Sequence, residues 1–112
     1  MFFNVHGLLM HNMVVGNFDY VQLGMPKKKK RTLSPDYPRD PADVYRWLEQ
    51  IGWQITGKTG VRVFHDYLRV KQMQRDCFPA LVELETRYCR QEPYINLGRY
   101  IHVTALKPQV QG

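Results

Sequence analysis

Residues 24–41 constrain the fold of this chain more strongly than any other segment. They read GMPKKKKRTLSPDYPRDP and contain four prolines and five consecutive basic residues. Proline lacks the amide hydrogen that helices and sheets use, and adjacent like charges repel each other. We therefore expect a basic, proline-rich loop over 26–40, which separates an N-terminal segment, 1–25, from the region 41–112.

The N-terminal segment, 1–25, is expected to form β structure. Its apolar residues fall into β-prone runs on either side of Gly16-Asn17, and Gly-Asn between such runs favours a hairpin turn. The segment has no Lys or Arg, and His and Asn side chains interrupt its apolar opening. We therefore expect neither a signal peptide nor a membrane span.

A helix is expected to begin directly after the loop. Asp40 suits the N-cap, Pro41 suits the first helical position, and Gly52 suits the residue just past the helix end. Between them, apolar side chains recur at the spacing of one helical face, at Val44, Trp47, Leu48 and Ile51.

Two further helices and one strand are expected in the rest of the chain. A helical stripe of apolar residues covers 61–73, although its valines also allow a strand, and another covers 78–91. Residues 99–106 alternate in character, as in a half-buried strand. The order predicts a small single domain of α+β class, with an N-terminal β-hairpin and a C-terminal strand in one antiparallel sheet packed against about three central helices.

Residues 52–59 read GWQITGKT and match GxxxxGK[ST], the pattern of the phosphate-binding loop of nucleotide triphosphatases. That loop needs a buried strand in front of it, so that its amides and Lys58 can reach the phosphates. The helix expected in front of Gly52 argues against this context. Nucleotide binding is therefore only a remote alternative, and no cofactor is expected.

A second interpretation of the same stretch is a helix-turn-helix. Two helices joined through Gly52 and the TGKTG turn match that motif in spacing only. Lys58 would then lie at the start of the second helix, where free amides favour a phosphate, and Arg62 and Arg69 would lie near its exposed face. An ordinary helical hairpin that serves the core explains the same spacing.

The charge of the chain favours anionic partners. Sixteen Lys and Arg residues stand against 10 Asp and Glu residues, for a net charge of +6. The run 27–31 suits either a nuclear-localisation signal or contacts to nucleic-acid phosphates, and the last strand adds a basic, aromatic surface of a kind that binds single strands. The residues expected to bind nucleic acid are Lys27, Lys28, Lys29, Lys30, Arg31, Lys58, Arg62, Arg69, Arg99 and Tyr100.

Metal binding and catalysis have weaker support. His6, His11, Cys77 and Cys89 lack the close pairing in sequence that zinc sites show. Two cysteines also do not make a disulfide framework, which favours a reducing interior. No pair of carboxylates and no nucleophile with a neighbouring histidine stands out. We therefore expect no metal site and no enzyme.

The function expected from these features is non-enzymatic binding of DNA or RNA through the phosphate backbone, in the style of a viral or phage accessory protein. The alternative is a protein-interaction module, an inhibitor or adaptor, that uses 27–31 as a targeting tag. Its apolar residues 1–25 would add a strand to a partner or to a second copy. Either protein would be intracellular, in the nucleus of a eukaryotic host or otherwise in the cytoplasm, and would not bind a membrane.

Overall fold

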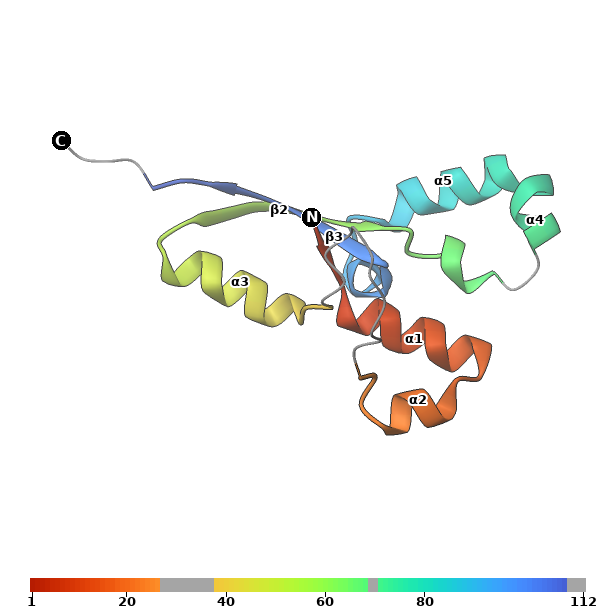
Figure 1. Ribbon diagram of the computed structural model, residues 1–112. Coiled ribbons are helices and arrows are strands. Elements are labelled where there is room, and N and C mark those ends of the chain that lie inside the picture. Colours follow the sequence, from red (N-terminus) through yellow and green to blue (C-terminus); the bar gives the residue numbers. More distant parts are fainter. Residues whose placement is uncertain (27–37, 69–70, 109–112) are drawn as a thin grey trace.

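The computed structural model describes residues 1–26, 38–68 and 71–108. These contain five α-helices, two 3₁₀-helices (η) and a three-stranded antiparallel sheet, which confirms the predicted α+β class (Figure 1). In chain order the elements are β1 (Phe2–Phe3), α1 (Val5–Val15), α2 (Phe18–Gln22), α3 (Pro41–Gln50), β2 (Gln54–Val61), η1 (His65–Tyr67), α4 (Lys71–Asp76), α5 (Phe78–Tyr88), η2 (Tyr94–Leu97) and β3 (Tyr100–Leu106).

The sheet has the strand order β1-β3-β2, and β3 runs antiparallel to both of its neighbours. β1 and β2 are therefore parallel to each other and end at the same edge of the sheet, where β3 begins. Tyr100, at the start of β3, pairs with Phe3 on one side and with Val61 on the other. The residues that follow β1 and β2 are thereby brought close to the residues that precede β3.

Three of the predicted elements are confirmed. α3 begins at Pro41, and Asp40 caps it by accepting a hydrogen bond from the Ala42 amide at 3.0 Å. Gly52 follows the helix end with a φ of +86°, a conformation that favours glycine. α5 and β3 lie where apolar periodicity and alternation predicted a helix and a strand. α3 lies along β2 and covers one face of the sheet there (Figure 1).

The predicted N-terminal hairpin is wrong, because most of that segment is helical. Only Phe2–Phe3 form a strand, which does join β3 in one antiparallel sheet. Asn4 caps α1, and Gly16, with a φ of +83°, ends it, so that Gly16-Asn17 separates two helices. A glycine with positive φ ends a helix as readily as it turns a hairpin, and a long apolar run does not distinguish a buried helix from a strand.

The predicted turn and helix after Gly52 are also wrong. Gln54–Val61, which contains most of GWQITGKT, is the strand β2, so that neither a helix-turn-helix nor a phosphate-binding loop forms there. In place of a continuous helix over 61–73, the described residues form the short turn η1 and the beginning of α4.

Close contacts around β2 explain why it contains the glycines that suggested a turn. A Cβ atom on Gly57 would lie 2.8 Å from Thr104 Oγ1, and one on Gly60 would lie 2.6 Å from Val63 Cγ1. Glycine in a strand commonly marks such a close approach of neighbouring atoms. The glycines that looked like turn residues therefore let β2 pack closely against its surroundings.

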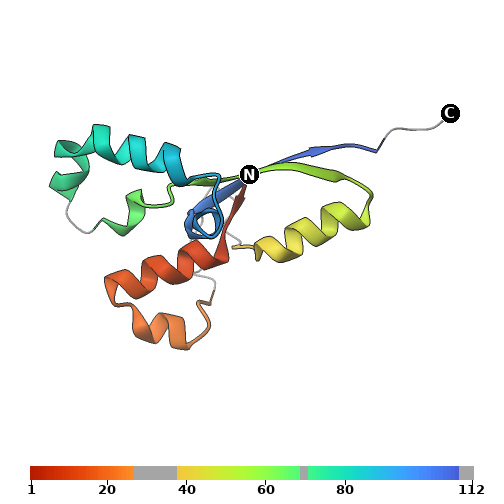
Figure 2. The ribbon, with the colours of Figure 1, turned by 180° about the vertical axis from the view of Figure 1, so that it is seen from behind.

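The apolar core is small and the molecule is extended. Among the described residues, the large apolar side chains that are buried are Val63, Leu81, Ile95 and Ile101. The radius of gyration is 16.3 Å, whereas a compact domain of about 100 residues has about 13 Å. Figure 2 shows three helical arms around the sheet, formed by α1 with α2, by α3, and by α4 with α5. No described helix is long and apolar enough to cross a membrane.

The predicted loop 26–40 is described only at its two ends, and 27–37, which contains Lys27–Arg31, lies outside the described residues. Arg39 lies next to β1 and makes two backbone hydrogen bonds there. Its amide donates to the Phe3 carbonyl at 2.7 Å, and its carbonyl accepts from the Val5 amide at 3.0 Å. The end of this segment therefore borders the edge of β1 that does not face β3.

Candidate anion-binding site at the strand ends

Two arginines and one aspartate meet at the edge where β1 and β2 end. Arg62 directly follows β2, Arg99 directly precedes β3, and Asp66 lies in η1. Arg62 Nη2 lies 2.6 Å from Asp66 Oδ1, and Arg99 Nη1 lies 3.8 Å from Asp66 Oδ2. Because two guanidinium cations share one carboxylate, the cluster keeps an excess positive charge. The side chains of Arg62 and Arg99 are 43% and 47% exposed, whereas that of Asp66 is 13% exposed.

The cluster lines a cavity of about 110 Å³, well above the ~10–15 Å³ that one water molecule needs. Its lining combines polar and apolar side chains. His11 Nδ1 lies 3.2 Å from the backbone oxygen of Asp66, which connects α1 to η1. The residues around the cavity are Phe3, Gly7, Leu8, His11, Arg62, Asp66, Tyr67, Leu97 and Arg99.

Arg62 has an uncommon backbone conformation that other residues hold in place. Its φ is +61°, a region that costs a non-glycine residue roughly 1–3 kcal/mol and often occurs at functional sites. Glu85 of α5 stabilises the turn that follows. Its carboxylate accepts hydrogen bonds from the amides of Val63, Phe64 and His65 at 2.9, 2.7 and 2.8 Å. α5 therefore positions Arg62 at the cavity through this turn.

Tyr67 fixes another wall of the cavity and stays protonated at neutral pH. Its hydroxyl donates a hydrogen bond to the Leu97 carbonyl at 2.5 Å. Burial, and secondly the charge of Asp66, raise the pKa of Tyr67 to about 12. The hydroxyl therefore acts as a donor at neutral pH and is unsuited to act as a base there.

The raised pKa of Tyr67 predicts how stability depends on alkaline pH. The folded state holds this proton more tightly than the unfolded state, whose tyrosine pKa is near 10, so the contribution is complete below about pH 10 and is lost as the pH rises through about 12. A spectrophotometric titration should show a tyrosine that ionises near pH 12 and is missing in Tyr67→Phe. A tyrosine that still ionises near pH 12 in Tyr67→Phe would contradict the assignment.

The structure brings together only part of the predicted nucleic-acid-binding set. Arg62 and Arg99 meet at Asp66, as described above. Lys58 lies elsewhere, with its Nζ 3.9 Å from the centre of the Tyr45 ring of α3. The Tyr100 ring packs against Phe3 at 5.6 Å between ring centres. Lys27–Arg31 and Arg69 lie outside the described residues.

Of the residues around the cavity, only Arg62 and Arg99 were among the predicted site residues, and the polar side chains of His11, Asp66 and Tyr67 were missed. His11 belongs to a segment expected to be a strand, and Asp66 and Tyr67 were assigned to a continuous helix. The spacing of Arg62 and Asp66, four residues apart with opposite charges, was the available signal for their ion pair. Within the described residues, no three His, Cys, Asp or Glu side chains converge to hold a metal ion.

Comparison with known proteins gives close relatives for this chain. No family model matches it. A protein of Escherichia coli (strain K12) named tRNA 5-carboxymethoxyuridine methyltransferase is 84% identical over 109 residues, which are 97% of this chain and 42% of the relative. The protein of the same name from Escherichia coli O157:H7 gives the same identity and coverage. The chain therefore spans less than half the length of the curated relatives it matches.

These relatives overturn several predictions. The chain was expected to be a non-enzymatic protein of viral or phage style, yet its relatives are named as a methyltransferase, which is an enzyme. The relatives also come from a bacterium, which has no nucleus, so the nuclear-localisation interpretation of 27–31 is wrong. They are named for a tRNA nucleoside, which overturns the predicted DNA-binding role and is compatible with RNA as the nucleic acid. Over nearly all its length, the chain is similar to one part of a bacterial enzyme named for a modified tRNA nucleoside.

Proposed function

We propose that this chain is part of a methyltransferase that acts on tRNA carrying 5-carboxymethoxyuridine. The observation that carries the proposal is the identity of 84% over 97% of the chain with proteins of that name. Methyl transfer also needs a methyl donor, and we assign no described side chain to it. The contribution that we propose for this chain is to hold the RNA.

The charge of the chain supports contact with RNA. Its net charge is +6, and RNA carries one negative charge per phosphate. Arg62 and Arg99 present exposed guanidinium groups at the cavity, and arginine suits carboxylates and phosphates because its planar fork donates two parallel hydrogen bonds. RNA is therefore the nucleic acid that we propose as partner.

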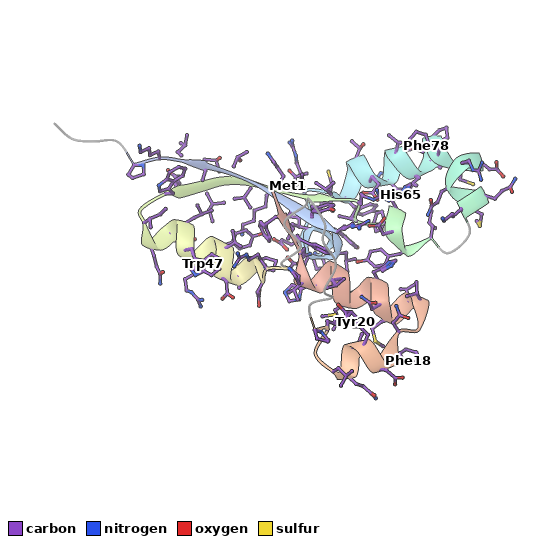
Figure 3. The ribbon with its side chains drawn as sticks, viewed as in Figure 1. Met1, Phe18, Tyr20, Trp47, His65 and Phe78 are labelled. Carbon is purple, nitrogen blue, oxygen red and sulfur yellow. The ribbon has the colours of Figure 1, made fainter. Side chains whose placement is uncertain are left out.

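Exposed apolar side chains support the proposal that the chain packs against further polypeptide. Phe18 on α2, Trp47 on α3 and Phe78 at the start of α5 are 55%, 45% and 54% exposed and lie on the outside of the molecule (Figure 3). α1 contains no Asp, Glu, Lys or Arg, and its Met10, Met13 and Val15 side chains are exposed, as is common where an apolar surface contacts further polypeptide. In each relative, more than half of its own polypeptide lies outside the matched segment. We propose that this remaining part covers α1.

The activity can be tested by a segment exchange. In the K12 relative, the 109 matched residues are replaced by those of this chain, to give a protein that we call the exchange protein. It is expressed in an E. coli strain that lacks the relative, and the nucleosides of digested tRNA are measured by mass spectrometry. We expect the nucleoside methylated from 5-carboxymethoxyuridine to reappear. A stable exchange protein with no such nucleoside would contradict the proposed function.

If the remaining part of the relative covers α1, a charge introduced on α1 should lower the yield of soluble exchange protein, whereas a charge introduced on an exposed residue should not. Met13 of α1 is 43% exposed in this chain, so Met13→Glu should leave the helix content of the isolated chain unchanged. In the exchange protein the same carboxylate would be buried without a partner, which costs several kcal/mol and should abolish the soluble protein. Gln50→Glu, at the exposed end of α3, is the matched control and should have no effect in either protein. Equal yields for Met13→Glu and Gln50→Glu exchange proteins would refute the covering of α1.

A further inference from the structure

We propose that the cavity at the strand ends binds the carboxylate of 5-carboxymethoxyuridine and that Arg62 is its main contact. The inference rests on the proposed function, because it takes the nucleoside from it. It goes further by assigning one part of that nucleoside, its negatively charged substituent, to one cavity of this chain.

The charge of the cavity fits a carboxylate. Arg62 and Arg99 contribute two positive charges and Asp66 contributes one negative charge, so one further negative charge balances the cluster. The partly buried position of Asp66 keeps its interaction with the arginines less screened by solvent than a surface pair. A bound carboxylate would be attracted by both guanidinium groups and repelled by Asp66, so the attraction prevails because the cluster carries two positive charges and one negative charge.

The hydrogen-bonding capacity of the arginines is not used up by Asp66. A guanidinium group has five N–H donors, and Arg62 directs its Nη2 to Asp66 at 2.6 Å. The separation of 3.8 Å between Arg99 Nη1 and Asp66 Oδ2 is longer than a hydrogen bond. Donors therefore remain on both side chains for the two oxygens of a ligand. Asp66 acts as a positioning residue, because it holds the Arg62 fork at the cavity.

The shape and lining of the cavity favour a terminal carboxylate over a backbone phosphate. The apolar side chains of Phe3, Leu8 and Leu97 form walls that offer no hydrogen bonds to a sugar–phosphate chain. A carboxymethoxy group is the free end of a substituent, so it can enter a recess of about 110 Å³, whereas a phosphodiester continues on both sides and needs an open groove. The apolar walls would also contact the methylene group and the pyrimidine ring.

The position of the cavity in the fold also suits a ligand site. It lies beyond the ends of β1 and β2 and beside the start of β3, so that segments far apart in sequence line it together. The backbone of Arg62 pays a conformational cost there, and Glu85 of α5 holds the turn that follows it. Such supported strain is typical of a residue whose direction matters for function.

The test measures binding by the exchange protein to two forms of one tRNA, one with 5-carboxymethoxyuridine and one with unmodified uridine at that position. We expect the unsubstituted protein to prefer the modified tRNA. Arg62→Ala should weaken binding of the modified tRNA by about 10- to 100-fold, as for loss of a charged hydrogen bond, and should change binding of the unmodified tRNA by less than about threefold. Arg62→Gln, which keeps the length of the side chain without its charge, should do the same.

Arg87→Ala is the matched control, because Arg87 is an exposed arginine of α5 that pairs with Glu83 and does not line the cavity. It should leave the preference for the modified tRNA unchanged. Equal weakening of both tRNAs by Arg62→Ala would assign Arg62 to a phosphate and overturn the proposal, and so would unchanged binding of both. Failure of the proposed function is a separate result, because it would show as missing methylation by the unsubstituted exchange protein, whereas the selectivity of binding is measured without methyl transfer.

Discussion

Replacing Glu85 by alanine is expected to lower the free energy of unfolding of this chain by about 3 kcal/mol, which is a large part of the stability of a small domain. Three backbone amides, of Val63, Phe64 and His65, lose the carboxylate that accepts their hydrogen bonds. Hydrogen bonds to a charged group contribute more than neutral ones, and Val63 is fully buried, so its surroundings cannot readily supply water instead. Urea unfolding followed by circular dichroism measures the change.

Glu83→Ala is the matched control for this prediction. Glu83 lies on the same helix but pairs with the exposed Arg87 four residues away. Exposed pairs of this kind contribute about 0.3–0.5 kcal/mol, so the control should unfold almost like the unchanged chain. If the two substitutions lowered stability equally, the turn after β2 would not depend on Glu85.

A milder substitution of Glu85 should change binding at the candidate site. Glu85 does not line the cavity at the strand ends, but it holds the turn directly after Arg62. In the exchange protein, Glu85→Gln should therefore reduce the preference for modified tRNA while it changes stability less than Glu85→Ala. An unchanged preference would show that Arg62 is directed by other contacts.

Replacing Asn4 by alanine is the second substitution with a large expected effect, a loss of about 3 kcal/mol. Asn4 is fully buried, and its amide nitrogen donates to the carbonyls of Asn96 and Gly98, both at 2.8 Å. Its side-chain oxygen accepts from the His6 amide and so caps α1. Alanine would leave the buried Gly98 carbonyl and the partly buried Asn96 carbonyl without these donors, and α1 without its cap.

Asn17→Ala is the control for Asn4→Ala. Asn17 is exposed and donates one hydrogen bond, to Asn12 Oδ1 at 3.0 Å. Its loss should cost roughly 0.5–1 kcal/mol, the usual net value of one hydrogen bond. Thermal unfolding of both variants measures the difference. Equal stability of Asn4→Ala and Asn17→Ala would contradict the structural role of Asn4.

The elements that were predicted correctly can be recognised from residues that are adjacent in the sequence. The cap at Asp40, the apolar stripe of α3 and the φ of Gly52 all lie within one stretch of chain, so the helix could be predicted without knowledge of any partner. The alternation of β3 has the same local character. The arginines of the candidate site were likewise predicted as anion-binding residues from their charge, although Asp66 was not predicted to join them.

The elements whose prediction was wrong, α1 and β2, depend on contacts between segments that are distant in the sequence. α1 is an apolar run that suits a strand or a helix equally, and its first residues are placed by Asn4, which bonds to carbonyls more than 90 residues away. In β2 the glycines resemble turn residues until Thr104 and Val63 lie close enough to exclude a Cβ atom. Local propensity is a weak preference, and packing overrides it where such contacts form.

Periodicity, capping and charge are properties of adjacent residues, so they are enough to predict the α+β class, α3, α5, β3 and the basic character of the chain. That GWQITGKT lies mostly in a strand, and that Arg62 and Arg99 line one cavity, depends on contacts between distant segments. β3 lies between β1 and β2 and so brings the ends of strands that are far apart in sequence to one end of the sheet. There the two guanidinium groups share Asp66, and their remaining donors make the site suited to an anion.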